Sequence, residues 1–115
     1  MPSPNHLPQA IERLCAISAR DMAHLRSVTD TPTNYVDTAI FCDAVIRHGV
    51  VDAYRAHLRE PTAHTHGQLS SLLNLLLRRS AKPVRDGSRT PVPSDDFGRA
   101  VIFALVALSR PDDPG

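Results

Sequence analysis

The stretch LSSLLNLLLRR, residues 69–79, decides the fold class of this chain. Its leucines recur at intervals of three and four residues: Leu69, Leu72, Leu73 and Leu76. These intervals match the 3.6-residue turn of an α-helix and place the four side chains on one face. We therefore predict a helix with a packed leucine face, covered by other helices of a bundle.

A second helix with one apolar face is predicted upstream, from about Pro8 to Ser27. Proline suits a first helical position because its φ is already fixed and a missing N–H costs nothing there. The apolar residues of this segment follow helical spacing, which only Ser18 interrupts. Three charged residues are expected on the outer face: Arg13, Arg20 and Asp21. The following TDTPTN (29–34) is predicted to be a turn.

The next helical region begins near Thr33 or Asn34, and between Ala39 and Ile46 only Asp43 is polar. A segment that is apolar on more than one face is expected at the centre of a bundle. The sequence RHG (47–49) is typical of a helix stop, yet helical spacing resumes in residues 50–60. We expect either a kink or a break at Gly49, and the end of the element at Pro61.

The end of the chain is predicted to hold a loop and one more helix. The leucine-rich helix is expected to start at THGQ (65–68), which has the pattern of a capping box. Residues 80–93 contain three prolines and one glycine, which predicts an extended loop. Ser94 is a suitable N-cap for the last helix. AVIFALVAL (100–108) is apolar all round; a strand at 101–103 is an alternative, but the alanines and the length of the run favour a helix.

These patterns predict an all-α protein with a single domain over residues 1–115, a bundle of four or five helices with tails at 1–7 and 110–115. At this length a domain buries roughly two-thirds of its unfolded surface and needs no metal or disulfide to fold. Cys15 and Cys42 lie in apolar helical stretches, and we expect buried thiols rather than a disulfide. No secretory signal pattern and no run of about eighteen apolar residues occurs, so we expect a cytoplasmic protein without a membrane partner.

The sequence contains no pattern typical of an enzyme. G-x-S-x-G, H-E-x-x-H and a Walker-type loop are all absent. The DFG at 96–98 lacks the glycine-rich loop, strand lysine and HRD loop that a protein kinase combines with it. The aspartates lie mostly at helix starts and in turns, where helix capping explains them. We therefore expect no catalytic residue and no cofactor.

Three histidines lie close to Pro61 on both sides: His57, His64 and His66. They would meet if the chain bends at the proline. Zinc requires three or four ligands with further hydrogen-bond support, and no cysteine or obvious fourth ligand lies nearby. We expect solvated histidines and no metal site.

The most concentrated charge lies in RRSAKPVRDGSR (78–89), although the formal net charge of the chain is only +1. This stretch contains five cations: Arg78, Arg79, Lys82, Arg85 and Arg89. Guanidinium groups bind phosphate bidentately, so the stretch suits a nucleic-acid backbone without base recognition. Three more arginines would extend this surface: Arg47, Arg55 and Arg59. A loop that only keeps the bundle soluble is the alternative.

The last helix carries more apolar surface than one buried face requires. One stripe contains Phe97, Val101, Leu105 and Leu108, and a second contains Ile102, Phe103 and Val106. Either the bundle surrounds this helix completely, or the second face contacts another chain. We predict an interface with other subunits or with copies of the same chain at four residues: Phe97, Ile102, Phe103 and Val106.

LSSLLNLLLRR, the proline-containing loop and VPSDDFGRAVIFALVAL together resemble the small-subunit family of multi-subunit CRISPR effector complexes, over about residues 69–108. The resemblance implies a helical bundle that is not an enzyme, touches neighbouring subunits and holds a guide–target duplex or a displaced strand. It implies that Arg78 and Arg79 face nucleic acid and that the helix from Phe97 supports the bundle or contacts a neighbour. The long loop at 80–93 and the scarcity of aromatic residues depart from the family pattern.

We therefore expect a non-enzymatic structural subunit that binds the phosphate backbone of RNA or DNA in a larger ribonucleoprotein assembly. Two other classes stay open. One is a small helical regulator that binds another protein, such as an anti-activator, a phage inhibitor or an immunity protein. The other is a viral binder of double-stranded RNA.

Overall fold

The computed structural model describes residues 6–27, 33–80 and 95–109, and these residues form a bundle of helices. The elements are α1 (Leu7–Ser27), α2 (Thr33–Val45), the π-helical turn η1 (Ile46–Val50), α3 (Val51–Arg59), α4 (Ala63–Ser80) and α5 (Asp95–Ser109). No strand occurs in these three ranges, so the prediction of an all-α bundle is confirmed. Residues 101–103 are helical, and the alternative of a strand there is wrong.

Several sequence predictions fall on residues outside these ranges. The structure does not describe residues 29–32 of the predicted turn, residues 81–93 of the predicted loop, the predicted N-cap Ser94, or residues 1–5 and 110–115 of the predicted tails. The N-terminal tail was predicted to extend to residue 7. This is wrong for Leu7, which begins α1 and is buried in the core.

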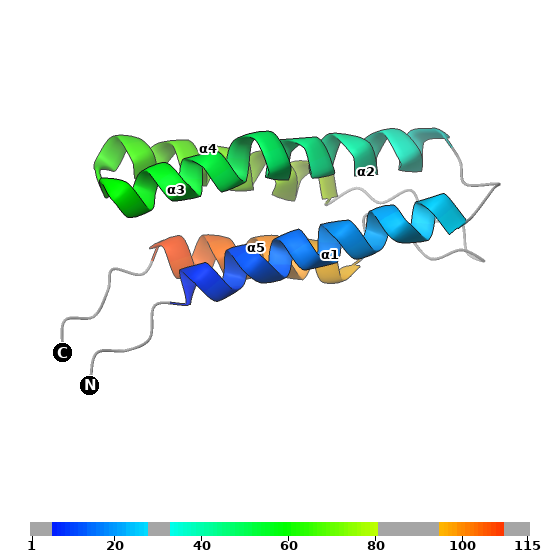
Figure 1. Cartoon of the computed structure of the whole chain (residues 1–115), viewed down its shortest axis with the longest axis horizontal. Coiled ribbons are helices and arrows are strands. Elements are labelled where there is room, and N and C mark those ends of the chain that lie inside the picture. Colours follow the sequence, from blue (N-terminus) through cyan, green and yellow to red (C-terminus); the bar gives the residue numbers. More distant parts are fainter. Residues whose placement is uncertain (1–5, 28–32, 81–94, 110–115) are drawn as a thin grey trace.

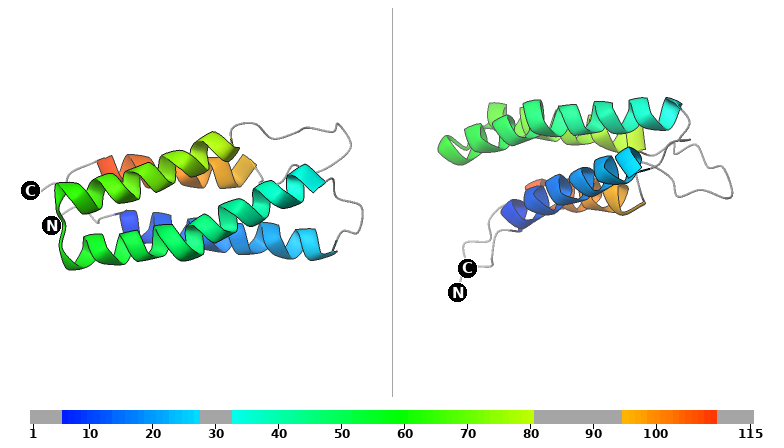
Figure 2. Two further views of the ribbon diagram at one scale, coloured as in Figure 1. Left: turned by 90° about the horizontal axis from the view of Figure 1, so that it is seen from above. Right: turned by 45° about the vertical axis from the view of Figure 1, so that its right-hand side comes forward.

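The helices form two layers (Figure 1). One layer holds α1 and α5, which run side by side in opposite directions; the other holds α4 beside the rod made of α2, η1 and α3. Figure 2 shows the second layer from above and the two layers edge-on. The molecule measures 50 × 25 × 21 Å along its principal axes, so its shape follows the length of the helices.

The rod from Thr33 to Arg59 is continuous, so of the two predicted alternatives at Gly49, a kink or a break, the break is wrong. A π-helical turn joins α2 to α3, and the residues on both sides of it keep α-helical φ and ψ. Gly49 does not have a positive φ, so conformational freedom is not the reason for glycine here. A Cβ at this position would lie only 3.3 Å from Cδ2 of Leu72. The glycine therefore allows α4 to approach the rod closely.

The core between the two layers is aliphatic, with Phe97 as its largest fully buried side chain. The leucine face predicted for α4 is confirmed at three of its four residues, since Leu69, Leu73 and Leu76 have no exposed surface. Leu72 is partly buried and packs against the core. Asp21, which was predicted on the outer face of α1, is instead buried together with Ser18. The prediction was wrong because the stripe that α1 buries is wide enough to include both positions, and Arg20 Nη2 lies 3.6 Å from the carboxylate of Asp21.

The N-terminus of α4 has a capping box, but three residues earlier than predicted. The Thr65 N–H donates to Oγ1 of Thr62 over 3.1 Å, and the Thr62 N–H donates to Oγ1 of Thr65 over 2.9 Å. The predicted start at residue 65 was wrong because Thr62 and Thr65 satisfy the same reciprocal pattern with a threonine in the second position. Before this cap, α3 ends at Arg59 and Glu60 is extended, as expected for a residue that precedes a proline.

We predict that Leu73→Ala lowers the free energy of unfolding by about 2–5 kcal/mol, because it leaves a cavity in the core. Leu58→Ala is the matched control. Leu58 is 57% exposed, whereas Leu73 is 0% exposed, and the control should change stability by less than about 0.5 kcal/mol. Urea unfolding followed by circular dichroism measures both values. Equal losses for the two variants would contradict the assignment of the α4 leucine face to the core.

Candidate interaction surfaces

Arg78 and Arg79 both lie in the last turn of α4, but their surroundings differ. Arg78 is exposed in the last turn of the helix, where a cation suits the negative end of the helix dipole. The guanidinium carbon of Arg79 lies 4.4 Å from the ring centroid of Phe41 on α2, which is cation–π distance. Phe41 therefore holds Arg79 in place, and one face of its guanidinium group is already occupied.

Arg47 pairs with an acid of its own helical rod. Its Nε lies 3.1 Å from Oδ2 of Asp43, one turn earlier, and Asp43 Oδ1 accepts a hydrogen bond of 3.1 Å from Oγ of Ser18 on α1. The Asp43 carboxylate is largely buried, so it requires both partners. The charge of Arg47 is thus partly neutralised within the molecule.

Arg55 and Arg59 lie one turn apart on the exposed surface of α3. Together with Asp52 and Leu58 they line a shallow hollow of about 530 Å³. No ion pair joins either arginine to an acid in the part of the chain that the structure describes. These two are therefore the arginines on the rod best placed to bind an external anion.

The predicted basic residues do not form one patch in the described ranges. Arg79 lies beside Phe41, and Arg59 lies 18 residues farther along the same rod, roughly 27 Å away at 1.5 Å per residue. The structure brings Arg55 and Arg59 together, keeps Arg47 apart from them, and places Arg78 and Arg79 at the other end of the layer. Lys82, Arg85 and Arg89 lie outside the described residues.

The α5 face predicted as a protein interface is exposed at three of its four residues. Ile102, Phe103 and Val106 have exposed fractions of 49%, 46% and 42%. Their positions, three and four residues apart, place them on one face of the helix. Phe97 is 1% exposed and belongs to the core, so its assignment to the interface is wrong. Phe97 shares the inner stripe with Val101 because a spacing of four residues returns to the same face.

Two of the three histidines near Pro61 meet, as the bend suggested. The ring centroids of His57 and His66 are 6.0 Å apart. His57 Nδ1 lies 2.9 Å from Thr65 Oγ1, and His66 Nε2 donates to the Leu108 carbonyl over 3.2 Å. Within the described residues, no group of three His, Cys, Asp or Glu side chains is placed to hold a metal ion. The pair instead joins the ends of α3, α4 and α5.

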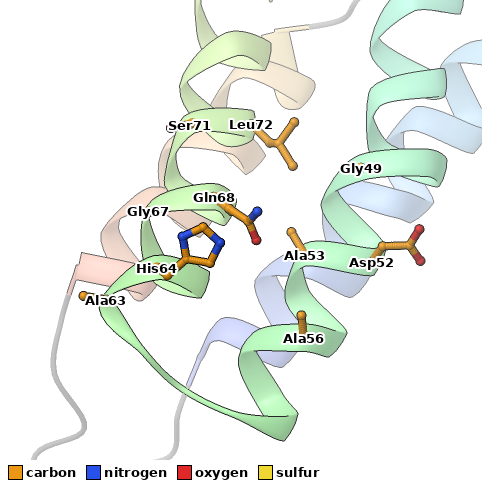
Figure 3. Close-up of a pocket in the computed structure, with 10 residues that line it drawn as sticks. All are labelled: Gly49, Asp52, Ala53, Ala56, Ala63, His64, Gly67, Gln68, Ser71 and Leu72. Carbon is orange, nitrogen blue, oxygen red and sulfur yellow. The ribbon is translucent and has the colours of Figure 1, made fainter.

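A groove that the sequence analysis did not predict lies between α3 and α4 (Figure 3). It has a volume of about 800 Å³ and is lined by Gly49, Asp52, Ala53, Ala56, Ala63, His64, Gly67, Gln68, Ser71 and Leu72. Figure 3 shows that it opens on the outer side of this layer, with α1 and α5 behind the two helices. Half of the lining residues are glycine or alanine, so the groove can accept large side chains from outside.

The signal for this groove is present in the sequence. Small residues recur four residues apart on α4, at Ala63, Gly67 and Ser71. They also recur at helical spacing on the rod, at Gly49 in η1 and at Ala53 and Ala56 on α3. Each series alone predicts only a small-residue stripe on a helix. That the two stripes face the same groove depends on how α3 packs beside α4.

The two cysteines are free thiols. Burial, which outweighs the opposing effect of the nearby Arg79, raises the pKa of Cys42 from 9.0 to about 11. Burial and the negative charge of Asp43 also raise the pKa of the Cys15 thiol. Both thiols therefore stay protonated at neutral pH, and neither has the environment of a reactive nucleophile.

No helix in the described ranges is long and apolar enough to cross a membrane. Comparison of the chain with protein-family models, curated proteins and solved structures found no match. The resemblance to CRISPR small subunits therefore stays a prediction.

We predict that iodoacetamide at pH 8 modifies Cys42 much more slowly than an unburied thiol. A pKa of about 11 instead of 9.0 lowers the thiolate fraction about a hundredfold, a factor of ten for each pKa unit, and burial slows access further. Mass spectrometry of timed samples should find Cys15 labelled before Cys42, and both labelled quickly in urea. Rapid labelling of Cys42 in the folded protein would contradict its place in the core.

Proposed function

We propose that this protein is a non-enzymatic structural subunit that binds another protein through the exposed face of α5. The observation that supports this function is the clustering of Ile102, Phe103 and Val106 on one side of a helix whose opposite side already fills the core. Complete burial of such side chains is worth about 1.5–3 kcal/mol each. An exposed cluster of this kind is typical of an interaction site.

The rest of α5 explains why the cluster is not needed for folding. Phe97, Val101 and Leu108 are buried against the other helices, together with Ala100 and Ala104. This inner stripe anchors α5 on α1 and α4. The outer face is therefore available to a partner without any change in the bundle.

A second candidate function is the binding of a nucleic-acid backbone, and the position of Arg78 favours it. Arg78 is exposed at the end of α4, where the five-cation stretch 78–89 begins. Arg78 and Arg79 belong to the α2–α4 layer and the apolar cluster belongs to the layer of α1 and α5. A subunit of this kind would hold a protein on one layer and a phosphate backbone beside the other, the combination that the resemblance to CRISPR small subunits implies.

The protein-binding function is tested by native mass spectrometry of the chain purified from its natural host. We predict that the wild-type protein carries additional protein mass, another subunit or a further copy, and that Phe103→Asp loses it because a carboxylate cannot enter an apolar interface. The control is Ile40→Asp, a side chain that is 48% exposed on a different helix, α2. Circular dichroism must show that Phe103→Asp is folded; if it retains the additional mass while folded, the proposal fails.

The nucleic-acid function is tested by gel-shift titration at two salt concentrations. Four or five neutralised phosphates predict a log–log salt slope of roughly −3 on single strands and about −4 on duplex DNA. The triple variant Arg78→Ala, Arg79→Ala, Lys82→Ala should flatten this slope and weaken binding to all sequences alike. Arg13→Ala, an exposed arginine on α1, is the control. If wild-type protein fails to shift RNA or DNA even at low salt, this second function is excluded.

A further inference from the structure

We propose that the partner of the α5 face is a second copy of this chain, which receives Ile102, Phe103 and Val106 in its groove between α3 and α4. This inference rests on the proposed protein-binding function and names the partner. It joins the cluster of exposed large apolar side chains to the apolar groove of about 800 Å³.

The groove is suited to side chains that come from outside. Its walls contain Gly49, Ala53, Ala56 and Gly67, which end at Cα or Cβ. A Cβ built at Gly67 would have no other heavy atom within 4 Å, so no neighbour inside the molecule requires glycine there. Glycine in the middle of a helix is destabilising relative to alanine. The open space above Gly67 is explained if a side chain of another molecule fills it.

The exposed apolar face of α5 has a shape that fits the groove. Val106 follows Phe103 by three residues and Ile102 by four, so the three side chains make a compact ridge about one helical turn long. The groove runs past Gly49, Ala53 and Ala56, about two turns of helix, and can receive the ridge along its length. Ridges of one helix that enter the grooves of others are the usual way in which helices pack.

Each surface carries at its edge one charge that can pair with a charge of the other. On the groove this charge is Asp52, which also lines the neighbouring hollow together with Arg55 and Arg59. Arg99 lies three residues before Ile102 and four before Phe103, at one end of the ridge, and is 78% exposed. Its only ion pair among the described residues is with Asp96, over 3.5 Å. On the groove, Asp52 lies on the rim with its side chain directed away from α4 (Figure 3), and no partner within the described residues binds it. Arg99 of one copy and Asp52 of the next can therefore pair as the ridge enters.

The groove and the ridge belong to different layers, so one molecule cannot join its own two surfaces. The contact is heterologous: each added copy leaves one free groove and one free ridge. Such contacts build a ring or an open filament instead of a closed two-fold dimer. An α5-to-α5 contact, in contrast, would stop at two copies.

Sedimentation velocity over a concentration series tests this geometry. The wild-type protein should form species larger than a dimer as its concentration rises. Gly67→Phe fills the groove and leaves the ridge intact, whereas Ile102→Asp destroys the ridge and leaves the groove intact. Each variant alone should stay monomeric, with association weakened at least tenfold. Their equimolar mixture should form a 1:1 dimer and nothing larger, because only one good groove and one good ridge remain.

Two further variants separate blocking of the groove from damage to the fold. Gly67→Ala adds only a methyl group and should assemble like the wild-type protein. Asp52→Arg should weaken assembly by the loss of the pair with Arg99 and the repulsion that replaces it. The double variant Asp52→Arg, Arg99→Asp should restore assembly, which a misfolded protein would not do.

The outcomes also separate this inference from the function on which it rests. If Gly67→Phe assembles like the wild-type protein while Ile102→Asp does not, the groove is not the partner surface, although the α5 face still binds protein. A wild-type protein that stays monomeric at every concentration overturns self-assembly. Protein mass of a different subunit, lost in Phe103→Asp in the native-host experiment, would then leave the proposed function intact.

Discussion

The buried leucine face of α4 is the constraint on which the rest of the structure depends. Leu69, Leu73 and Leu76 are covered completely, and α4 packs against α5 on one side and against the rod of α2, η1 and α3 on the other. The contact between α4 and α5 joins the two layers, and α1 adds a second connection through α2. Gly49 lets the rod approach Leu72, and this close approach brings α3 and α4 together.

Both candidate protein-binding surfaces follow from this arrangement. The inner stripe of α5 is used against α1 and α4, which leaves Ile102, Phe103 and Val106 about half exposed, with the His6 ring 6.4 Å from the ring of Phe103. On the other layer, small residues let α3 and α4 lie close to each other, and the same small residues leave a groove on the outer side. The same packing of the helices therefore produces both the exposed ridge on α5 and the groove between α3 and α4.

Several arginines have partners within the molecule, a use of charge that the sequence did not reveal. Arg47 is used to neutralise Asp43, Arg79 is held against Phe41, and Arg20 pairs with Asp21 and Asp96. A charge count along the chain cannot separate such arginines from free ones, because the partners come from other helices or from another turn. Among the described arginines predicted to bind a phosphate backbone, those without a partner of this kind are Arg78 at the end of α4 and Arg55 and Arg59 on α3.

The sequence by itself determined the all-α fold, the leucine face of α4, the helical state of 100–108 and the second apolar stripe of α5, because helical periodicity is a local property that residue spacing records directly. Tertiary structure alone decided the continuity of the rod at Gly49, the burial of Asp21 and Phe97, the cap at Thr62 and the groove. Each of these depends on which neighbour a residue meets. Gly49 has the pattern of a helix stop in the chain but is a contact point beside Leu72. The spacing of small residues predicts a stripe on each helix, but only the packing of α3 beside α4 joins two stripes into one binding surface.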